Sequence, residues 1–243
     1  MDAIARNLKT IQDTIAAACD RARRDPAGVT LVAVSKLRSP ETILAAADAG
    51  VQHFGENRVE EAQEKLPKIA DLIVAQTMAQ VLTWHMVGHV QSRKARHIPA
   101  LFDMVHSVDN IKLAEKLSRL ASARQPLDVL LQMNISGEES KDGFPAANWQ
   151  TDVEVREQLW SQTKFVLKLP GLRVRGLMTM APIVTDMEQI RPVFASLTAL
   201  RNAFSESFAI ALPELSMGMT DDYPVAVEEG ATMVRIGRAL FGE

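Results

Sequence analysis

The sequence predicts an α/β fold: a single (β/α)8 barrel domain over residues 1–243, with an extra helix at its N-terminal end. Short apolar segments rich in β-branched residues alternate with segments of helical period along the chain. Eight strand-like segments can be counted, whereas a doubly wound sheet usually has about five to seven strands. No segment rich in Pro, Gly or Ser interrupts the alternation, so one domain is the simplest division.

The extra helix is expected between Asp2 and about Arg24. Its apolar residues recur at spacings of three and four, which is the period of one helix face. They are Ile4, Leu8, Ile11, Ile15 and Cys19. The segment TLVAVSK (30–36) follows and is almost continuously apolar, which is typical of a strand covered on both faces in a parallel sheet.

The next segments carry helix start and stop signals. Ser39 and Pro40 predict an N-cap and a first helical residue, and Gly50 predicts the end of that helix. Asn57 and Glu60 predict a capping box at the start of the second helix of the barrel. Each helix is expected to lead into the next strand.

The remaining strands are expected at similar intervals. They cover 51–54, 83–88, 102–108, 127–135, 172–180, 213–217 and 231–237. Either Asp109 or Asn110 is expected to cap the helix that contains IKLAEKL. The polar, turn-rich segment 136–149 follows the fifth strand, and a loop in that position lies on the active face of a barrel.

The composition excludes several classes of protein. Hydrophobic residues make up 47% of the chain and charged residues 23%, which rules out disorder and fibrous repeats. The net charge is only -3 and no segment concentrates Lys and Arg beyond a short run such as that at 93–96, so we expect no nucleic-acid partner. The first residues lack the apolar core of a secretory signal, and no apolar run reaches the roughly 20 residues of a membrane helix. We therefore expect a cytoplasmic protein without a membrane partner, and the single cysteine, Cys19, fits a reducing compartment.

Lys36 directly follows the apolar first strand, so its amine is expected at the C-terminal mouth of the barrel. A neutral amine in that position can attack a carbonyl group and form a Schiff base. From position alone, a solvated surface lysine is the more common case.

The ends of the last two strands suit an anion such as phosphate. Barrels often bind phosphate between the loops after strands seven and eight, where backbone N–H groups approach the ligand closely. The candidate groups are the backbone at Gly218 and Gly237, the hydroxyls of Ser216 and Thr220, and the guanidinium of Arg238. The alternative is that the glycines only make tight turns. The GK[ST] ending of a nucleotide-binding P-loop is missing, so ATP is not implied.

Arg235 lies within the apolar eighth strand, two residues before Gly237, and is expected on the inward face near the mouth. A charge in such a strand needs a partner. A ligand acceptor and a carboxylate both satisfy that need, and the sequence leaves the two open.

His85 and His89 are four residues apart, which is the spacing of two metal ligands on a helix. The residues between them indicate a strand end and a turn, and the glutamate of a zincin motif is missing. The other histidines and Cys19 show no ligand spacing, so we expect no metal site.

Seven motifs, in the same order along the chain, resemble those of the pyridoxal phosphate homeostasis protein family. They are AVSK (33–36), HFGEN (53–57), WHMVG (84–88), NISGEESKDGF (134–144), GLMTMAP (176–182), LSMGM (215–219) and MVRIG (233–237), with FG at 241–242. The match runs from about residue 30 almost to the C-terminus. Members of this family resemble the barrel domain of bacterial alanine racemases, so the resemblance implies that fold and pyridoxal 5'-phosphate (PLP) as the cofactor.

The resemblance also implies a role for each matching residue. Lys36 holds PLP as a Schiff base, and Arg235 faces the pyridine nitrogen. The remaining cofactor-binding residues are Asn57 and His85 near the cofactor, Met178 and Met180 beside its ring, and Ser216, Gly218 and Gly237 around its phosphate.

Three positions depart from the family pattern. Arg238 stands where threonine is common at the phosphate, His89 where leucine is usual, and Arg93 where asparagine is common. Arg238 is nevertheless expected among the cofactor-binding residues. Its side chain either adds charge to the phosphate site or points away from it.

The resemblance implies a protein that binds PLP without robust turnover. An arginine at the pyridine nitrogen keeps that nitrogen unprotonated, which weakens the ring as an electron sink. Racemases compensate with positioned bases, including a tyrosine from a second domain, and no second domain is expected here. We therefore expect a monomer that is not an enzyme and that buffers PLP, or transfers it to apo PLP-dependent enzymes, in vitamin B6 homeostasis.

Two alternatives remain open from the sequence. One is a PLP-dependent amino-acid racemase of weak activity, for which Tyr223 is the only phenol in the chain that could act as an acid or base. The other is a barrel enzyme acting on sugar phosphates with Lys36 as its Schiff-base lysine, which fits the chemistry but not the motifs.

Overall fold

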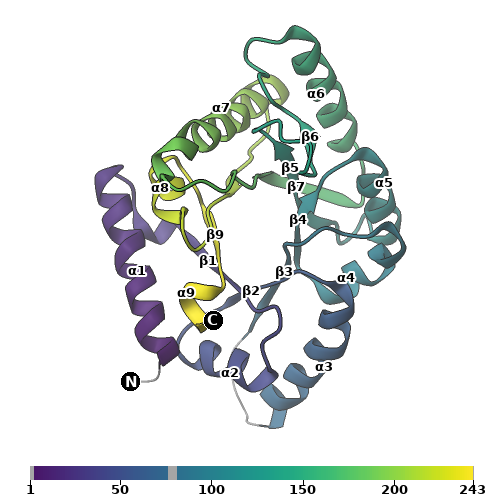
Figure 1. Cartoon of the computed structure of the whole chain (residues 1–243). Helices are drawn as coiled ribbons and strands as arrows, with labels where there is room; N and C mark the ends of the chain where they lie inside the picture. The colour runs from purple at the N-terminus through teal and green to yellow at the C-terminus, as the bar shows by residue number, and fades with distance from the viewer. Residues whose placement is uncertain (1–2, 76–80, 243) are drawn as a thin grey trace.

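The computed structural model describes residues 3–75 and 81–242, which form a closed barrel of parallel strands surrounded by helices (Figure 1). The strands pair in the order β4-β3-β2-β1-β9-β8-β7-β5, and a pairing between β4 and β5 closes the ring. Every pairing between neighbouring strands is parallel. The predicted (β/α)8 barrel is confirmed.

Within the described ranges, eight strands build the barrel, and each overlaps one predicted segment. They are β1 (Thr30–Val34), β2 (His53–Glu56), β3 (Thr83–Met86), β4 (Met104–Val108), β5 (Leu127–Asn134), β7 (Leu172–Met178), β8 (Glu214–Ser216) and β9 (Met233–Ile236). One short strand was not predicted: β6 (Phe144–Pro145) pairs with the end of β5 outside the ring. It lies in the segment 136–149, which is therefore partly extended rather than wholly turns.

The helices alternate with the strands and cover the outside of the barrel (Figure 1). They are α1 (Ala3–Arg21), α2 (Pro40–Asp48), α3 (Val59–Ala75), α4 (Ile98–Leu101), α5 (Ile111–Leu120), α6 (Val153–Val166), α7 (Arg191–Phe208), α8 (Tyr223–Glu228) and α9 (Arg238–Phe241). Three short 3₁₀ helices cover Pro26–Gly28, Ser92–His97 and Met187–Ile190. The extra N-terminal helix is present, although Asp2 lies outside the described residues. Among the described helices, none combines the length and the apolar character needed to cross a membrane.

Two of the predicted helix caps are present as expected. The Ser39 hydroxyl accepts a hydrogen bond from the backbone N–H of Thr42, and Pro40 is the first residue of α2. Gly50 follows the end of α2 with φ +108°, a left-handed conformation that favours glycine. Of the two candidates for α5, Asn110 is the cap, because its side-chain oxygen accepts from the N–H of Leu113 at 2.9 Å.

The capping box predicted at Asn57 is wrong. The helix α3 begins two residues later, at Val59. The side-chain oxygen Oδ1 of Asn57 is buried and accepts no hydrogen bond from any described residue. Asn57 therefore belongs to the connection that directly follows β2 and does not cap the helix.

The hydrophobic residues form two separate clusters. The larger one lies between the outward faces of the strands and the helices. The smaller one fills the interior of the barrel, because its members alternate with outward residues along the strands. It consists of Val32, Val87, Met104, Leu130, Met178 and Met233, with Val34 and Met180 partly buried against it.

The helix α1 packs against the last elements of the chain, α8 and α9 (Figure 1). The Asn7 side chain donates a hydrogen bond to the carbonyl of Leu240 at 3.0 Å. Arg21 pairs with Glu228 at 2.6 Å. The extra helix is thus held by polar contacts as well as by its apolar face.

A Gly176→Ala substitution is expected to destabilise the barrel. A Cβ at Gly176 in β7 would lie 1.8 Å from the carbonyl oxygen of Glu214 in β8, so the two strands have to separate. Overpacking of this kind lowers the free energy of unfolding by about 1–3 kcal/mol or more. Thermal unfolding measures the change. The matched control is Gly28→Ala, where an added Cβ meets nothing within 4 Å, and equal melting temperatures in the two variants would contradict the prediction.

Candidate functional site

The carboxyl ends of the barrel strands bring the predicted site residues to one mouth. Lys36 lies two residues beyond the end of β1, and Asn57 directly follows β2. Gly218 lies two residues beyond β8, and Gly237 directly follows β9. The parallel arrangement therefore collects residues that lie up to about 200 positions apart in the sequence.

Lys36 continues the inward row of β1, on which Val32 and Val34 face the barrel interior. The residue is exposed. Within the described part of the chain, its amine makes no hydrogen bond or ion pair. Lys36 therefore presents an uncommitted amine at the mouth.

A buried ammonium group supports the turn that carries Lys36. Lys65 on α3 is a buried lysine, with 7% of its side chain exposed. Its Nζ donates to three acceptors: the carbonyl of Ser35 at 2.9 Å, Glu56 Oε1 at 2.9 Å and Glu61 Oε1 at 2.6 Å. All three donors of the ammonium are thus satisfied, which is the condition for keeping a charge in a protein interior.

The two glutamates of this network also bind the residues on either side of Lys36. The hydroxyl of Ser35 donates to Glu56 at 2.7 Å, and the backbone N–H of Leu37 donates to Glu61 at 2.6 Å. Leu37 has φ +61°, a left-handed conformation that a leucine keeps only where its surroundings enforce it. Burial raises the pKa of Glu56, while hydrogen bonds from Ser35 and Lys65 lower it. This network of Lys65, Glu56 and Glu61 was not predicted from the sequence.

Arg235 is buried, as expected for an inward residue of β9. Its guanidinium donates to the hydroxyl of Ser216 at 2.6 Å and to the carbonyl of Thr179 at 3.0 Å. Burial lowers the pKa of Arg235 to about 10, so it stays charged at neutral pH. Among the described residues no carboxylate lies within ion-pair distance of it, so the acid-partner alternative left open by the sequence is not what holds it.

Three histidines continue this contact across the interior of the barrel. His106 Nδ1 lies 2.8 Å from the hydroxyl of Ser216, His85 Nδ1 lies 2.9 Å from His106 Nε2, and His53 Nδ1 lies 3.0 Å from His85 Nε2. Burial, with a smaller effect of neighbouring His53, lowers the pKa of His85 to about 3, and burial lowers that of His106 as well. Both imidazoles are therefore neutral at neutral pH. The chain joins β9 and β8 to β4, β3 and β2.

The hydroxyl of Ser216 is fully buried and contacts both Arg235 and His106. His85 likewise lies inside the barrel, with 1% of its surface exposed. Met178 is buried in the interior cluster and Met180 lies at its edge. These four residues form the floor beneath the mouth.

Two glycines shape the loops that follow β8 and β9. Gly218 has φ +93°, and a Cβ there would lie 2.7 Å from that of Ala226 in α8. A Cβ at Gly237 would lie 3.1 Å from the carbonyl oxygen of Val34 in β1. Both glycines therefore allow close packing at the mouth, which side chains would prevent.

Arg238 is engaged in an ion pair, whereas Tyr223 is buried. The exposed guanidinium of Arg238 pairs with Asp221 at 2.8 Å, so of its two alternatives the structure has the side chain directed to a carboxylate. Tyr223 begins α8 and is buried in the main hydrophobic cluster.

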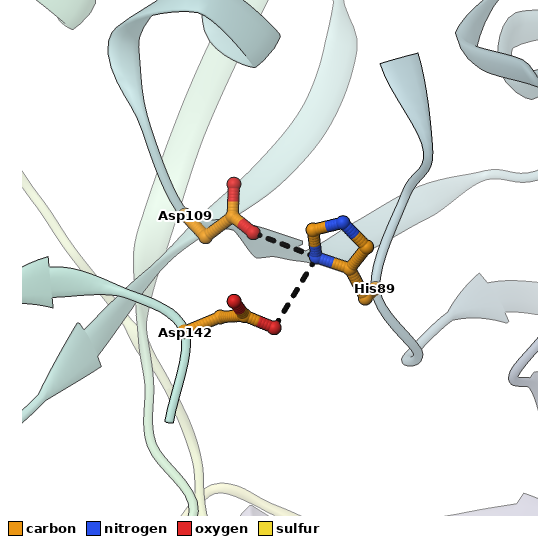
Figure 2. Close-up of side chains that lie close together, drawn as sticks. All are labelled: His89, Asp109 and Asp142. Atoms are coloured by element: carbon orange, nitrogen blue, oxygen red, sulfur yellow. Dashed lines mark ion pairs between the residues drawn. The ribbon is translucent and has the colours of Figure 1, made fainter. Parts of the chain in front are cut away.

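A second group of polar residues lies on the rim, on the loops after β3, β4 and β5. His89 Nδ1 is 2.9 Å from Asp109 Oδ2 and 3.3 Å from Asp142 Oδ2, as Figure 2 shows. Asp109 is buried, and burial raises its pKa. His89 and His85 do not share a site, because His85 faces the interior of the barrel and His89 faces these two carboxylates.

The whole chain, residues 1–243, matches the family model described as alanine racemase, N-terminal domain. The pyridoxal phosphate homeostasis protein of Pseudomonas aeruginosa is 40% identical over 243 residues, which cover 100% of this chain and 96% of that protein. That of Escherichia coli K12 is 38% identical over 247 residues, covering 100% and 97%. The chain belongs to the pyridoxal phosphate homeostasis protein family.

A solved structure of this family gives the same fold. PipY of Synechococcus elongatus with PLP bound is 33% identical, with a TM-score of 0.79, over 98% of this chain and 100% of that chain. This chain therefore has the fold of a solved relative. Lys36, Arg235, Gly218 and Gly237 lie in a barrel whose family is known.

The Lys65→Met variant is expected to lose stability, because it leaves the buried Glu56 without its cation. Removing one partner of a buried ion pair costs about 3–5 kcal/mol of the free energy of unfolding. Chemical denaturation measures the loss. Lys68→Met, at an exposed position of the same helix, is the control and is expected to change little. If Lys65→Met were as stable as Lys68→Met, the hydrogen bonds of Lys65 would make no contribution to the free energy of unfolding.

Acid is expected to destabilise the fold through His85. Its folded pKa of about 3 is below the ordinary 6.5, so the unfolded chain takes up the proton first. The free energy of unfolding therefore falls as the pH drops below about 6.5, and at pH 5 this one group accounts for about 2 kcal/mol. Denaturation at pH 7 and pH 5 measures the slope. The slope is expected to decrease in His85→Gln, and an unchanged slope in this variant would refute the assignment.

Proposed function

We propose that this protein binds PLP covalently through Lys36 at the barrel mouth and acts as a reservoir or donor of the cofactor. The single observation that carries the proposal is the uncommitted amine of Lys36, held on a turn whose neighbours Ser35 and Leu37 are fixed by Glu56 and Glu61. Membership of the family supports it, since relatives are named pyridoxal phosphate homeostasis proteins and one solved relative has PLP bound.

The residues at the mouth fit PLP in three respects. Asn57 Oδ1 is a buried acceptor to which none of the described residues donates, so it is available to a ligand. Glycine at 218 and 237 lets these two loops pack closely against α8 and β1, and backbone N–H groups of such loops suit a phosphate group. Arg235 presents a fixed, charged donor beneath the mouth.

Each residue has a defined task in this proposal. When bound, PLP supplies an aldehyde that condenses with an amine, with loss of water, and a ring that accepts electrons. Lys36 provides the amine. Arg235 would face the pyridine nitrogen and keep it unprotonated, while Met178 and Met180 would lie on the side of the ring. The backbone at Gly218 and Gly237 would hold the phosphate, with Arg238 paired to Asp221.

The arrangement favours binding over turnover. A racemase needs a base on each side of the reacting carbon, and Tyr223 is buried in the hydrophobic cluster. Both ring nitrogens of His85 and of His106 are already engaged, so neither histidine is free to move a substrate proton. We therefore propose a cytoplasmic, monomeric carrier whose partners are apo PLP-dependent enzymes, and not an enzyme.

Borohydride reduction of the PLP-treated protein tests the attachment site. The expected result is a single pyridoxyl adduct, mapped by peptide mass spectrometry to Lys36, and loss of the adduct in Lys36→Ala. The control is Lys141→Ala on the same rim, because the Lys141 amine is already bonded to Glu138 and to the carbonyl of Met180. An adduct at another lysine would overturn the assignment. Robust racemisation of amino acids by the purified protein, abolished in Lys36→Ala, would instead support the racemase alternative.

A further inference from the structure

The rim group of His89, Asp109 and Asp142 has the composition of a metal site. It offers one imidazole nitrogen and two carboxylate oxygens, and these three atoms all lie within 4.8 Å of one another. The residues come from three different loops, after β3, after β4 and between β5 and β6 (Figure 2). The three residues are not close together in the sequence. A short, regular spacing of metal ligands is therefore not expected for this group, and the lack of such a spacing does not argue against it.

The distances in the group match those of a coordination sphere. Two ligand atoms that each lie about 2.1 Å from one ion are about 3.0 Å apart at a right angle and about 3.4 Å apart at the tetrahedral angle. The two distances from His89 Nδ1, 2.9 Å and 3.3 Å, fall in this range. The remaining carboxylate separation is no more than 4.8 Å, and the exposed side chain of Asp142 can close it by rotation.

The charges of the group also favour a cation. Two carboxylates face one imidazole nitrogen, and a single N–H can point well at only one of them. One of the two, Asp109, has only 4% of its side chain exposed, so water compensates its charge poorly. A divalent ion bonds all three atoms at once and balances both negative charges.

Hydrogen bonds from three polar side chains, of which Ser107 and Gln132 are buried, hold the three loops in place, as the surroundings of metal ligands usually do. The hydroxyl of Ser107 donates to the carbonyl of Gly88, next to His89, at 2.6 Å. Asn110 donates to the other oxygen of Asp109 at 2.6 Å. Gln132, which is buried, donates to the backbone carbonyl of Asp142 at 2.8 Å.

The glycines beside two of the ligands show the same close fit. A Cβ at Gly88 would lie 2.2 Å from the backbone oxygen of Asn57, and one at Gly143 would lie 2.8 Å from the backbone nitrogen of Asn134. The chain next to His89 and next to Asp142 is therefore pressed against the strand ends. The side chains themselves remain half exposed, which leaves open positions for water or a ligand.

We propose that His89, Asp109 and Asp142 bind one divalent transition-metal ion on the rim of the barrel mouth. The imidazole ligand favours Zn²⁺, and the two carboxylates also suit Mn²⁺, whereas Mg²⁺ and Ca²⁺ prefer oxygen ligands alone. The three protein ligands leave further positions to water, as in metal sites that interact with a second molecule. The site is separate from Lys36, so its existence does not depend on PLP binding.

Isothermal titration of the untagged, chelator-treated full chain with ZnCl2 and with MnCl2 tests the proposal, and elemental analysis after dialysis gives the stoichiometry. The expected result is one ion per chain, with and without PLP. His89→Leu and Asp142→Asn are expected to weaken binding by at least about tenfold. Both positions are half exposed, so the variants are expected to fold, which circular dichroism checks. His97→Leu is the control for adventitious binding to a histidine outside the group.

Two results would overturn the proposal: no binding by the wild-type chain, or equal affinity in the wild type and His89→Leu. Tighter binding of MgCl2 than of ZnCl2 and MnCl2 would overturn the assigned ion class. Because the measurement follows the ion and not PLP, its failure leaves the borohydride result at Lys36 unaffected.

Discussion

The hydrogen bonds between β4 and β5 close the sheet into a ring, and the rest of the structure depends on that closure. In a closed ring every strand has one inward and one outward face, so residues two positions apart share the interior. Lys36 continues the inward row of Val32 and Val34, and Arg235 and Gly237 belong to the inward row of β9. Because both residues lie on inward rows, the amine of Lys36 is placed at the mouth and the buried guanidinium of Arg235 beneath it, although they come from opposite ends of the sequence.

Much of the fold could be predicted because its signals are local. The cap at Ser39 and the left-handed Gly50 depend on neighbouring residues only, and the eight strands follow from short apolar runs. The capping box at Asn57 failed because a local pattern competed with the end of β2, which keeps that residue in the strand connection. The position of Lys36 was also predictable, since it requires only the end of one strand.

The supporting contacts of the site could not be predicted in the same way. Lys65 donates hydrogen bonds to residues outside its own helix, and those partners cannot be identified from the sequence. Its position between Ala62 and Ile69 did indicate that Lys65 lies on the buried face of α3. The histidine chain joins five strands, and only the alternation of His85 and His106 with outward apolar residues indicated that they face inward. Contacts of this kind form only when the barrel closes. A local sequence pattern therefore does not indicate which residues become partners.

The packing of α1 against the end of the chain bears on how the molecule folds. Asn7 and Leu240, which are bonded to each other, are 233 positions apart in the sequence. During synthesis, α1 leaves the ribosome before its docking surface on α8 and α9 exists, so its apolar face stays uncovered until nearly the whole chain has been made. The contact of α1 with α8 and α9 can therefore form only late in synthesis, and it closes a loop of more than 200 residues.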